Sequence, residues 1–103
     1  MILHIATFRW KEDVTAQDVA ALTEQLLEMA AGIPELVAYR AGENLHLRPG
    51  GADYGVAAVV ADEAALAAYL DSDAHTAVYE ALLGRMIAER AAVQLPVGDG
   101  AAL

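Results

Sequence analysis

The spacing of apolar residues changes within residues 2–33 from the period of a strand to that of a helix. Residues 2–10 alternate, so that every second side chain would share one face of an extended strand: Ile2, His4, Ala6, Phe8 and Trp10. Residues 15–33 then carry apolar side chains at helical spacing, which would form one stripe: Val19, Leu22, Leu26, Met29 and Ile33. Thr15 can cap this helix, and Gly32 with Pro34 can end it. The chain therefore opens with a half-buried strand followed by an amphipathic helix.

The rest of the chain carries further strand and helix signals, each bounded by turn or cap residues. They predict strands over 36–47, 54–61 and 91–97, and helices over 63–70 and from Ser72 or Asp73 to about Arg85. The last helix would bury Val78, Leu82 and Met86. Glycines in the 48–53 segment favour a turn, and Asp62 can cap a helix.

The resulting order is β-α-β-β-α-β, with the second α in two pieces. This order predicts a ferredoxin-like α+β fold, in which helices cover one face of an antiparallel four-stranded sheet. We expect a single domain over residues 1–97 and a flexible, glycine-containing tail over residues 98–103.

The uncovered sheet face predicts self-association. Leu3, Ile5 and Thr7 would lie on that face if His4 points toward the helices. The composition agrees, because 57% of the residues are hydrophobic and the mean hydropathy is +0.36, which is high for a small free-standing domain. We therefore expect a homodimer formed through the sheet faces.

Charge and cysteine content exclude several classes of function. A net charge of −9 offers no basic patch for a phosphate backbone, so we expect no nucleic-acid partner. No apolar run is long enough to span a bilayer, and the N-terminus has no basic segment typical of an export signal. The chain has no cysteine, so it has no disulfide and no thiolate metal site. A cytoplasmic location is the simplest interpretation.

Tyr69 and His75 are the candidate catalytic residues. Six residues of one continuous helix would place them about 240° apart, but the break at Ser72 and Asp73 lets both point into one cavity. There His75 could take a proton next to a carbonyl, and the Tyr69 hydroxyl could donate to the developing enolate oxygen. In the alternative interpretation, His75 bonds locally in the first turn of a helix and Tyr69 simply packs.

The other polar candidates have simpler interpretations. His4 lies in an apolar strand, where a histidine is more often a hydrogen-bonded core residue than a ligand. His46 lies beside the flexible turn and should be solvated. His4, His46 and His75 lack the spacing of a local metal site, so we expect no metal. The acidic residues near the short helices are expected to act as helix caps.

The chain resembles the stress-responsive dimeric α/β-barrel family, known as Dabb, over residues 2 to about 96. The resemblance is carried by His4 with Phe8, Ile33-Pro34, Gly42-x-Asn44, and Ala65-Leu66-x-x-Tyr69 followed by His75. It implies a homodimer whose two sheets form a barrel with the helices outside. It also implies a small cavity between the sheet and the helices of each subunit.

One branch of this family is similar to polyketide cyclases of the olivetolic acid type. In that branch, the tyrosine and histidine that match Tyr69 and His75 serve an aldol cyclisation, and the histidine that matches His4 lines the site. The present chain departs from it at four pocket positions: Leu26 for a tyrosine, Ser72-Asp73 for His-Pro, Val60 for an aromatic residue, and Gln94 for an aspartate.

Two hypotheses for the function remain. In the first, the domain performs cofactor-independent acid–base chemistry, cyclase- or isomerase-like, on a small apolar or aromatic carbonyl compound. His75 and Tyr69 would be catalytic, and the substrate would contact His4, Phe8, Leu22 and Leu26. In the second, the protein is a non-catalytic stress-responsive or structural dimer. A haem- or quinone-handling monooxygenase of similar topology is less favoured, because no cofactor signature is present.

Overall fold

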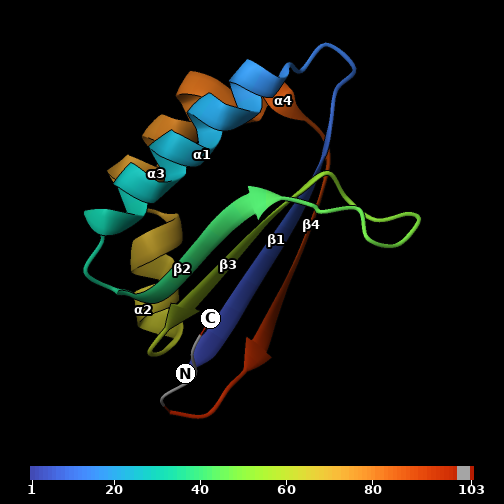
Figure 1. The fold of residues 1–103 in the computed structure, drawn as a ribbon. Helices are drawn as coiled ribbons and strands as arrows, with labels where there is room; N and C mark the ends of the chain where they lie inside the picture. Colours follow the sequence, from blue (N-terminus) through green and yellow to red (C-terminus); the bar gives the residue numbers. More distant parts are fainter. Residues whose placement is uncertain (100–102) are drawn as a thin grey trace.

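Four antiparallel strands form one sheet in the computed structural model, which describes residues 1–99 and residue 103 (Figure 1). The strands lie in the order β2-β3-β1-β4, with these bounds: β1 Ile2–Trp10, β2 Leu36–Glu43, β3 Tyr54–Val60 and β4 Ile87–Pro96. The helices cover one face of this sheet (Figure 1). The predicted ferredoxin-like α+β fold is therefore confirmed. None of the helices in the described residues is long and apolar enough to cross a membrane.

The first helix, α1 (Ala16–Ala31), begins and packs as its sequence predicts. The Thr15 hydroxyl oxygen accepts a hydrogen bond from the Asp18 backbone N–H at 3.1 Å, and Asp18 Oδ2 accepts one from the Thr15 N–H at 3.0 Å. This reciprocal capping stabilises the helix by about 1 kcal/mol. The apolar stripe is buried against the sheet: Val19, Leu22, Leu26 and Met29.

Two short helices follow β3 and meet at a sharp break. Asp62 caps α2 (Glu63–Leu70) by accepting from the Ala65 N–H, and Ser72 caps α3 (Asp73–Val78) by accepting from the His75 N–H. The Ser72 hydroxyl also donates to the Tyr69 carbonyl at 2.8 Å. Ser72 therefore ends one helix and begins the next, which fixes the angle between them.

The prediction of a single helix from residue 73 to about 85 is wrong for the middle of this segment. The segment is α3, then a π-helical turn, η1 (Tyr79–Leu83), and then α4 (Gly84–Met86). The wider turn points both Leu82 and Leu83 into the core, where each is 5% exposed.

Gly84 makes this turn possible, and we expect Gly84→Ala to lower the free energy of unfolding by about 1–3 kcal/mol. A Cβ there would lie 2.9 Å from Tyr79 Cε1 and 3.0 Å from the Tyr79 carbonyl oxygen. That overlap outweighs the gain in helix propensity, which is at most about 1 kcal/mol. Urea denaturation measures the change. Gly32→Ala is the control, because its Cβ would meet only the Met29 oxygen at 3.6 Å. Equal stability of the two variants would contradict the prediction.

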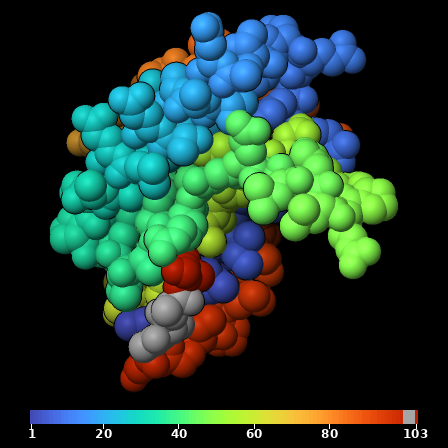
Figure 2. Space-filling view, in the orientation of Figure 1, coloured from blue at the N-terminus to red at the C-terminus, as the bar shows by residue number. Residues whose placement is uncertain are grey.

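Two strand boundaries differ from their predictions by four residues, and the ends of β3 and β4 differ by one. β2 ends at Glu43 rather than at residue 47, because the Asn44 side chain leaves the ladder and bonds the Ala52 carbonyl and the His46 N–H at the neck of a loop. This 44–53 loop projects from the body of the molecule (Figure 2). β4 begins at Ile87 rather than at residue 91, because it starts pairing opposite Trp10 as soon as α4 ends.

The sheet face opposite the helices carries the apolar side chains that the alternation predicts. Ile5 lies between Ala57 of β3 and Val93 of β4, and Leu3 lies opposite Leu95. Val93 and Leu95 are 46% and 42% exposed. Along the same face, Arg40 donates to the Leu103 carbonyl at 2.8 Å. Half of the tail predicted over 98–103 lies outside the described residues, since residues 100–102 are not among them.

Candidate functional site

The structure brings Tyr69 and His75 together between the sheet and the helices. Tyr69 lies at the end of α2 and His75 in the first turn of α3. Their ring centroids are 5.3 Å apart, and the ring planes meet at 87°. Tyr69 is 2% exposed, and His75 is half-buried. The Ser72 break allows this contact, because it turns α3 back over the last turn of α2.

His4 of β1 lies beside the Tyr69–His75 pair, and these three residues, with Tyr39 described below, are called the His75 cluster. His4 is the one buried polar residue of the described core, and its ring centroid lies 6.3 Å from that of Tyr69. Gln94, its register partner on β4, donates from Nε2 to His4 Nδ1 at 2.9 Å. In a neutral ring the proton is then on Nε2, so Gln94 fixes the tautomer as well as the orientation of His4.

Tyr39 of β2 completes the cluster, although the sequence analysis did not select it. Its ring centroid lies 6.3 Å from that of Tyr69, and its hydroxyl is buried without a hydrogen-bond partner among the described residues. Leaving such a group unpaired costs about 1–3 kcal/mol. The register could have found it, because Tyr39 lies beside Ala58, which in turn pairs with His4. A polar ligand atom at this point would satisfy the hydroxyl.

Burial sets the protonation of the cluster. It lowers the pKa of His75, as does the charge of Arg90, while Asp71 acts in the opposite direction. Burial, Arg90 and His75 together lower the pKa of His4. Burial raises the pKa of Tyr69 and of Tyr39. At neutral pH the histidines are therefore uncharged and the tyrosines protonated, so His75 can accept a proton and both phenols can donate hydrogen bonds.

The other predicted contact residues lie in the hydrophobic core. Phe8, Leu22 and Leu26 are 4%, 0% and 3% exposed. Phe8 stacks on Trp10 and Tyr54, with centroids 5.8 and 6.4 Å away, rather than on a ring of the cluster. That these three residues contact a substrate stays a prediction.

The cluster is closely packed in this structure. Five open hollows in the described part of the chain are lined by residues other than His4, Tyr69 and His75. One of these five lies in the groove between α1 and α3, and the others lie at the open sheet face or the 44–53 loop.

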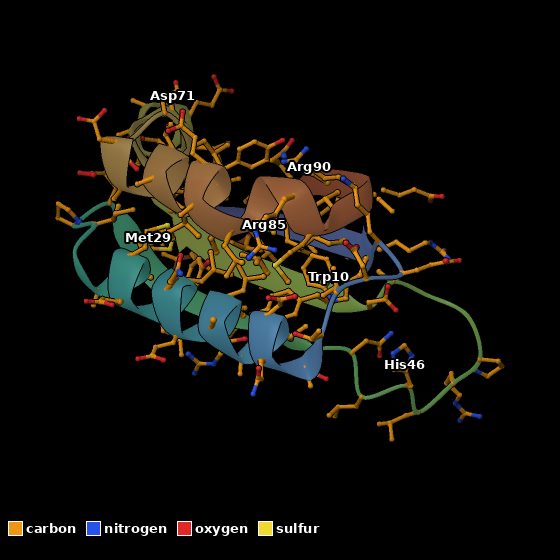
Figure 3. The ribbon with its side chains drawn as sticks, turned by 90° about the horizontal axis from the view of Figure 1, so that it is seen from above. Trp10, Met29, His46, Asp71, Arg85 and Arg90 are labelled. Carbon is orange, nitrogen blue, oxygen red and sulfur yellow. The ribbon has the colours of Figure 1, made fainter. Side chains whose placement is uncertain are left out.

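His46 lies far from this cluster, on the exposed 44–53 loop (Figure 3). Its backbone adopts a positive φ of 51°, and its N–H donates to Asn44 Oδ1 at 2.8 Å. Within residues 1–99 and 103, no group of three histidine or carboxylate side chains has a geometry that could hold a metal ion.

Arg90 is the second residue that sequence reasoning missed. The predicted start of the last strand at residue 91 left it outside the sheet, whereas β4 starts at Ile87 and includes it. Arg90 pairs with Phe8, whose side chain faces the helices, so Arg90 lies on the same side of the sheet as Gln94 and His4.

A sequence model of the family described as "Stress responsive A/B Barrel Domain", Dabb, matches residues 2–97. No protein of curated function gives a significant sequence match.

Solved structures agree with the family match. A dimeric ferredoxin-like protein of unknown function from Thermobifida fusca is 38% identical, with a TM-score of 0.86 over 93% of this chain and 90% of its own. A Dabb family protein from Mesorhizobium loti is 16% identical, with a TM-score of 0.78 over 94% and 97%. A hydroxynitrile lyase from Passiflora edulis is 11% identical, with a TM-score of 0.79 over 98% and 96%. The last two likenesses establish the fold alone.

Proposed function

The chain belongs to the stress responsive A/B barrel domain family, and from this we propose that it is a homodimeric enzyme performing cofactor-independent acid–base chemistry on a small carbonyl compound. The observation that carries the proposal is the contact between His75 and Tyr69, whose ring centroids are 5.3 Å apart. Burial lowers the pKa of this histidine, so it is a free base at neutral pH.

The chemistry follows from the proton states of the cluster. His75 takes a proton from the carbon next to the carbonyl group, and the Tyr69 hydroxyl donates a hydrogen bond to the enolate oxygen that forms. His4, held by Gln94, supplies a polar wall with a fixed donor. Return of the proton from His75 to another carbon of the conjugated enolate completes an isomerisation. Attack of the enolate carbon on a second carbonyl of the same molecule, whose oxygen then takes the proton back from His75, completes an aldol cyclisation.

The surroundings of the cluster suit a small apolar or aromatic ligand. Phe8, Leu22 and Leu26 lie on the same side of the sheet as His4 and would form the apolar wall once the ligand enters. The fold is compatible with catalysis, since a hydroxynitrile lyase shares it. We place the protein in the cytoplasm, without nucleic-acid or membrane partners, on the basis of its net charge of −9 and its lack of cysteine.

Dimerisation is supported by the open face of the sheet. Leu3, Ile5, Val93 and Leu95 form an apolar surface there, and the Thermobifida fusca relative is described as dimeric. Two such faces packed together would close the barrel and remove this surface from water.

A second candidate function is a non-catalytic stress-responsive or structural dimer. The observation that favours it is the close packing of the cluster, in which the Tyr69 ring centroid lies 5.3 Å from that of His75 and 6.3 Å from those of His4 and Tyr39. In that case the two histidines and two tyrosines serve as a polar part of the core.

Exchange of α-protons in D2O separates the two functions. The probes are a panel of β-diketones, β-keto esters and 2-oxo acids, followed by proton NMR. We expect the protein to accelerate exchange for one class, His75→Ala to reduce that acceleration by at least about 100-fold, and Tyr69→Phe by about 10-fold. His46→Ala, on the exposed loop, is the control and should change nothing. A protein that accelerates no exchange, or that does so equally without His75, would support the non-catalytic dimer.

A further inference from the structure

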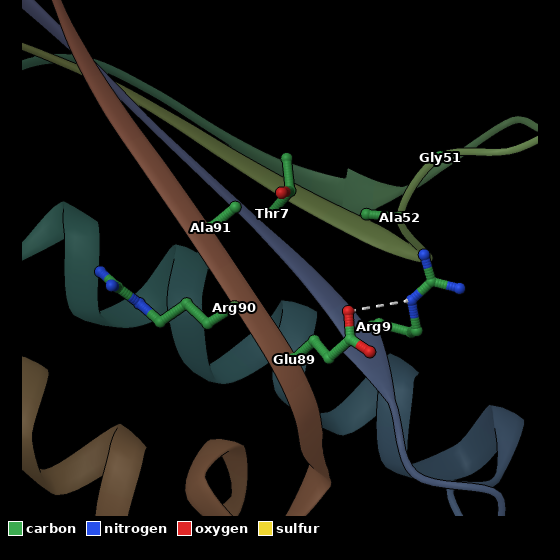
Figure 4. Close-up of a pocket in the computed structure, with 7 residues that line it drawn as sticks. All are labelled: Thr7, Arg9, Gly51, Ala52, Glu89, Arg90 and Ala91. Atoms are coloured by element: carbon green, nitrogen blue, oxygen red, sulfur yellow. Dashed lines mark ion pairs between the residues drawn. The ribbon is translucent and has the colours of Figure 1, made fainter.

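Arg90 occupies a distinctive position beside the His75 cluster. It lies on β4, one of the two edge strands of the sheet. Its side chain projects away from the Arg9–Glu89 pair, which lies on the opposite face (Figure 4). Figure 3 places it on the far side of the α3–α4 segment from Arg85. Arg90 is exposed, so a ligand approaching from the sheet edge would meet its guanidinium group before the buried rings.

This arginine has no carboxylate partner among the described residues. The two ion pairs there use other arginines: Arg9 lies 3.6 Å from Glu89, and Arg85 lies 3.8 Å from Asp18. Lys11, Arg40 and Arg48 form no ion pair among the described residues either, so what distinguishes Arg90 is its position on the helix-facing side of the sheet, the side on which His4 lies. Asp71 is the carboxylate whose charge acts on the same cluster, and it acts on His75.

The charge of Arg90 reaches the reacting groups. It lowers the pKa values of His75, His4 and Tyr69, whereas Asp71 raises only that of His75. Both histidines are uncharged at neutral pH, so Arg90 is the positive charge that the cluster presents to a ligand. Beyond the effect of burial, the nearby Tyr39 and Tyr69 hydroxyls interact with each other, which raises the pKa of Tyr39 and lowers that of Tyr69.

We propose that the ligand of this site is an anion, a keto acid whose carboxylate is bound by Arg90 while its carbonyl group meets Tyr69 and His75 at the edge of the cluster. This inference rests on the proposed function and adds the substrate class to it. A guanidinium group matches a carboxylate with two parallel hydrogen bonds. A chain of net charge −9 repels anions at long range, so an anionic ligand needs a local cation of this kind. A neutral ketone would form no ion pair with Arg90.

The first test needs no ligand. Ring resonances of His4 and His75, followed by NMR through a pH titration, give their pKa values in the wild type and in Arg90→Gln. We expect both values to rise in Arg90→Gln and to stay near the wild-type values in Arg90→Lys, which keeps the charge. Arg9→Gln is the control, because Arg9 lies on the other face of the sheet and pairs with Glu89. Unchanged pKa values in Arg90→Gln would overturn the placement of this charge at the site.

The second test compares matched ligands. A panel of 2-oxo and 3-oxo acids, each paired with its primary amide, is titrated against the protein. We expect at least one acid to bind at least about 10-fold tighter than its amide, Arg90→Gln to abolish this difference, and Arg9→Gln to keep it. A panel in which no acid binds more tightly than its amide, or in which Arg90→Gln keeps the difference, would overturn the proposal.

These outcomes separate the inference from the proposed function. If acids bind through Arg90 but His75-dependent proton exchange is absent, the anion site stands and the proposed catalysis is contradicted. If His75 exchanges the α-protons of neutral ketones equally well with and without Arg90, the proposed catalysis stands and the anion site is contradicted.

Discussion

Ile5→Asp is expected to convert the proposed homodimer into monomers by raising its dissociation constant about 1000-fold. Ile5 lies in the middle of the open sheet face, between Ala57 and Val93 in the register of the sheet. In a face-to-face dimer the twofold axis brings two copies of this face together, so each aspartate would lose water against an apolar surface and approach a second like charge. Burial of an unpaired charge and juxtaposition of like charges each cost several kcal/mol, and 1.4 kcal/mol corresponds to a tenfold change.

Analytical ultracentrifugation over a range of concentrations measures this effect. Val93→Asp is the second variant, because Val93 is 46% exposed on the edge strand and its replacement should leave the monomer folded. Leu27→Asp is the control, since Leu27 is 49% exposed on α1, on the helical side of the molecule. Dimers that persist in both sheet-face variants, or a wild type that is monomeric at every concentration, would contradict dimerisation through this face.

Leu22→Ala is expected to lower the free energy of unfolding by about 3–5 kcal/mol. Leu22 is 0% exposed at the centre of the apolar stripe of α1, where it packs in the core cluster between the helix and the sheet. The substitution removes buried methyl and methylene groups and leaves a cavity that a sheet cannot easily collapse to fill. Chemical denaturation at a fixed protein concentration measures the loss, because dimerisation couples stability to concentration.

Leu27→Ala provides the matched control for this prediction. The same atoms are removed from the same helix, but from a side chain that is 49% exposed. Its effect should stay within about 0.5 kcal/mol. Similar losses in the two variants would mean that the stripe of α1 does not form the core that the structure gives it. A large loss in His75→Ala as well would favour a structural role for the cluster.

The caps and the face assignments could be predicted from sequence because each depends on neighbours within one or two turns. Thr15 and Asp18 are three residues apart and satisfy each other, and the alternation of β1 alone decides that His4 and Phe8 share one face of the strand. The π-helical turn could not be predicted in this way. It depends on the fit of Leu82 and Leu83 against the sheet, and on the absence of a side chain at Gly84.

Some residues of the candidate site could likewise be predicted from the sequence, and others could not. The sequence selected Tyr69, His75 and His4, and it supplied the Ser72 break that brings the first two together. It did not select Tyr39 or Arg90, because their proximity depends on strand register and on where β4 begins. His46, which the sequence treated as solvated, lies on the exposed loop.

By itself the sequence determined the element order, the buried face of β1 and α1, and the residues able to carry proton chemistry, because periodicity and capping are local properties of a chain. Only the tertiary structure decided that residues as distant as His4 and Gln94 form a hydrogen bond, that Tyr39 has an unpaired hydroxyl among the described residues, and that Arg90 lies on the same side of the sheet as His4. These contacts join strands whose pairing is set by the packing of the whole sheet, and no local pattern specifies that pairing.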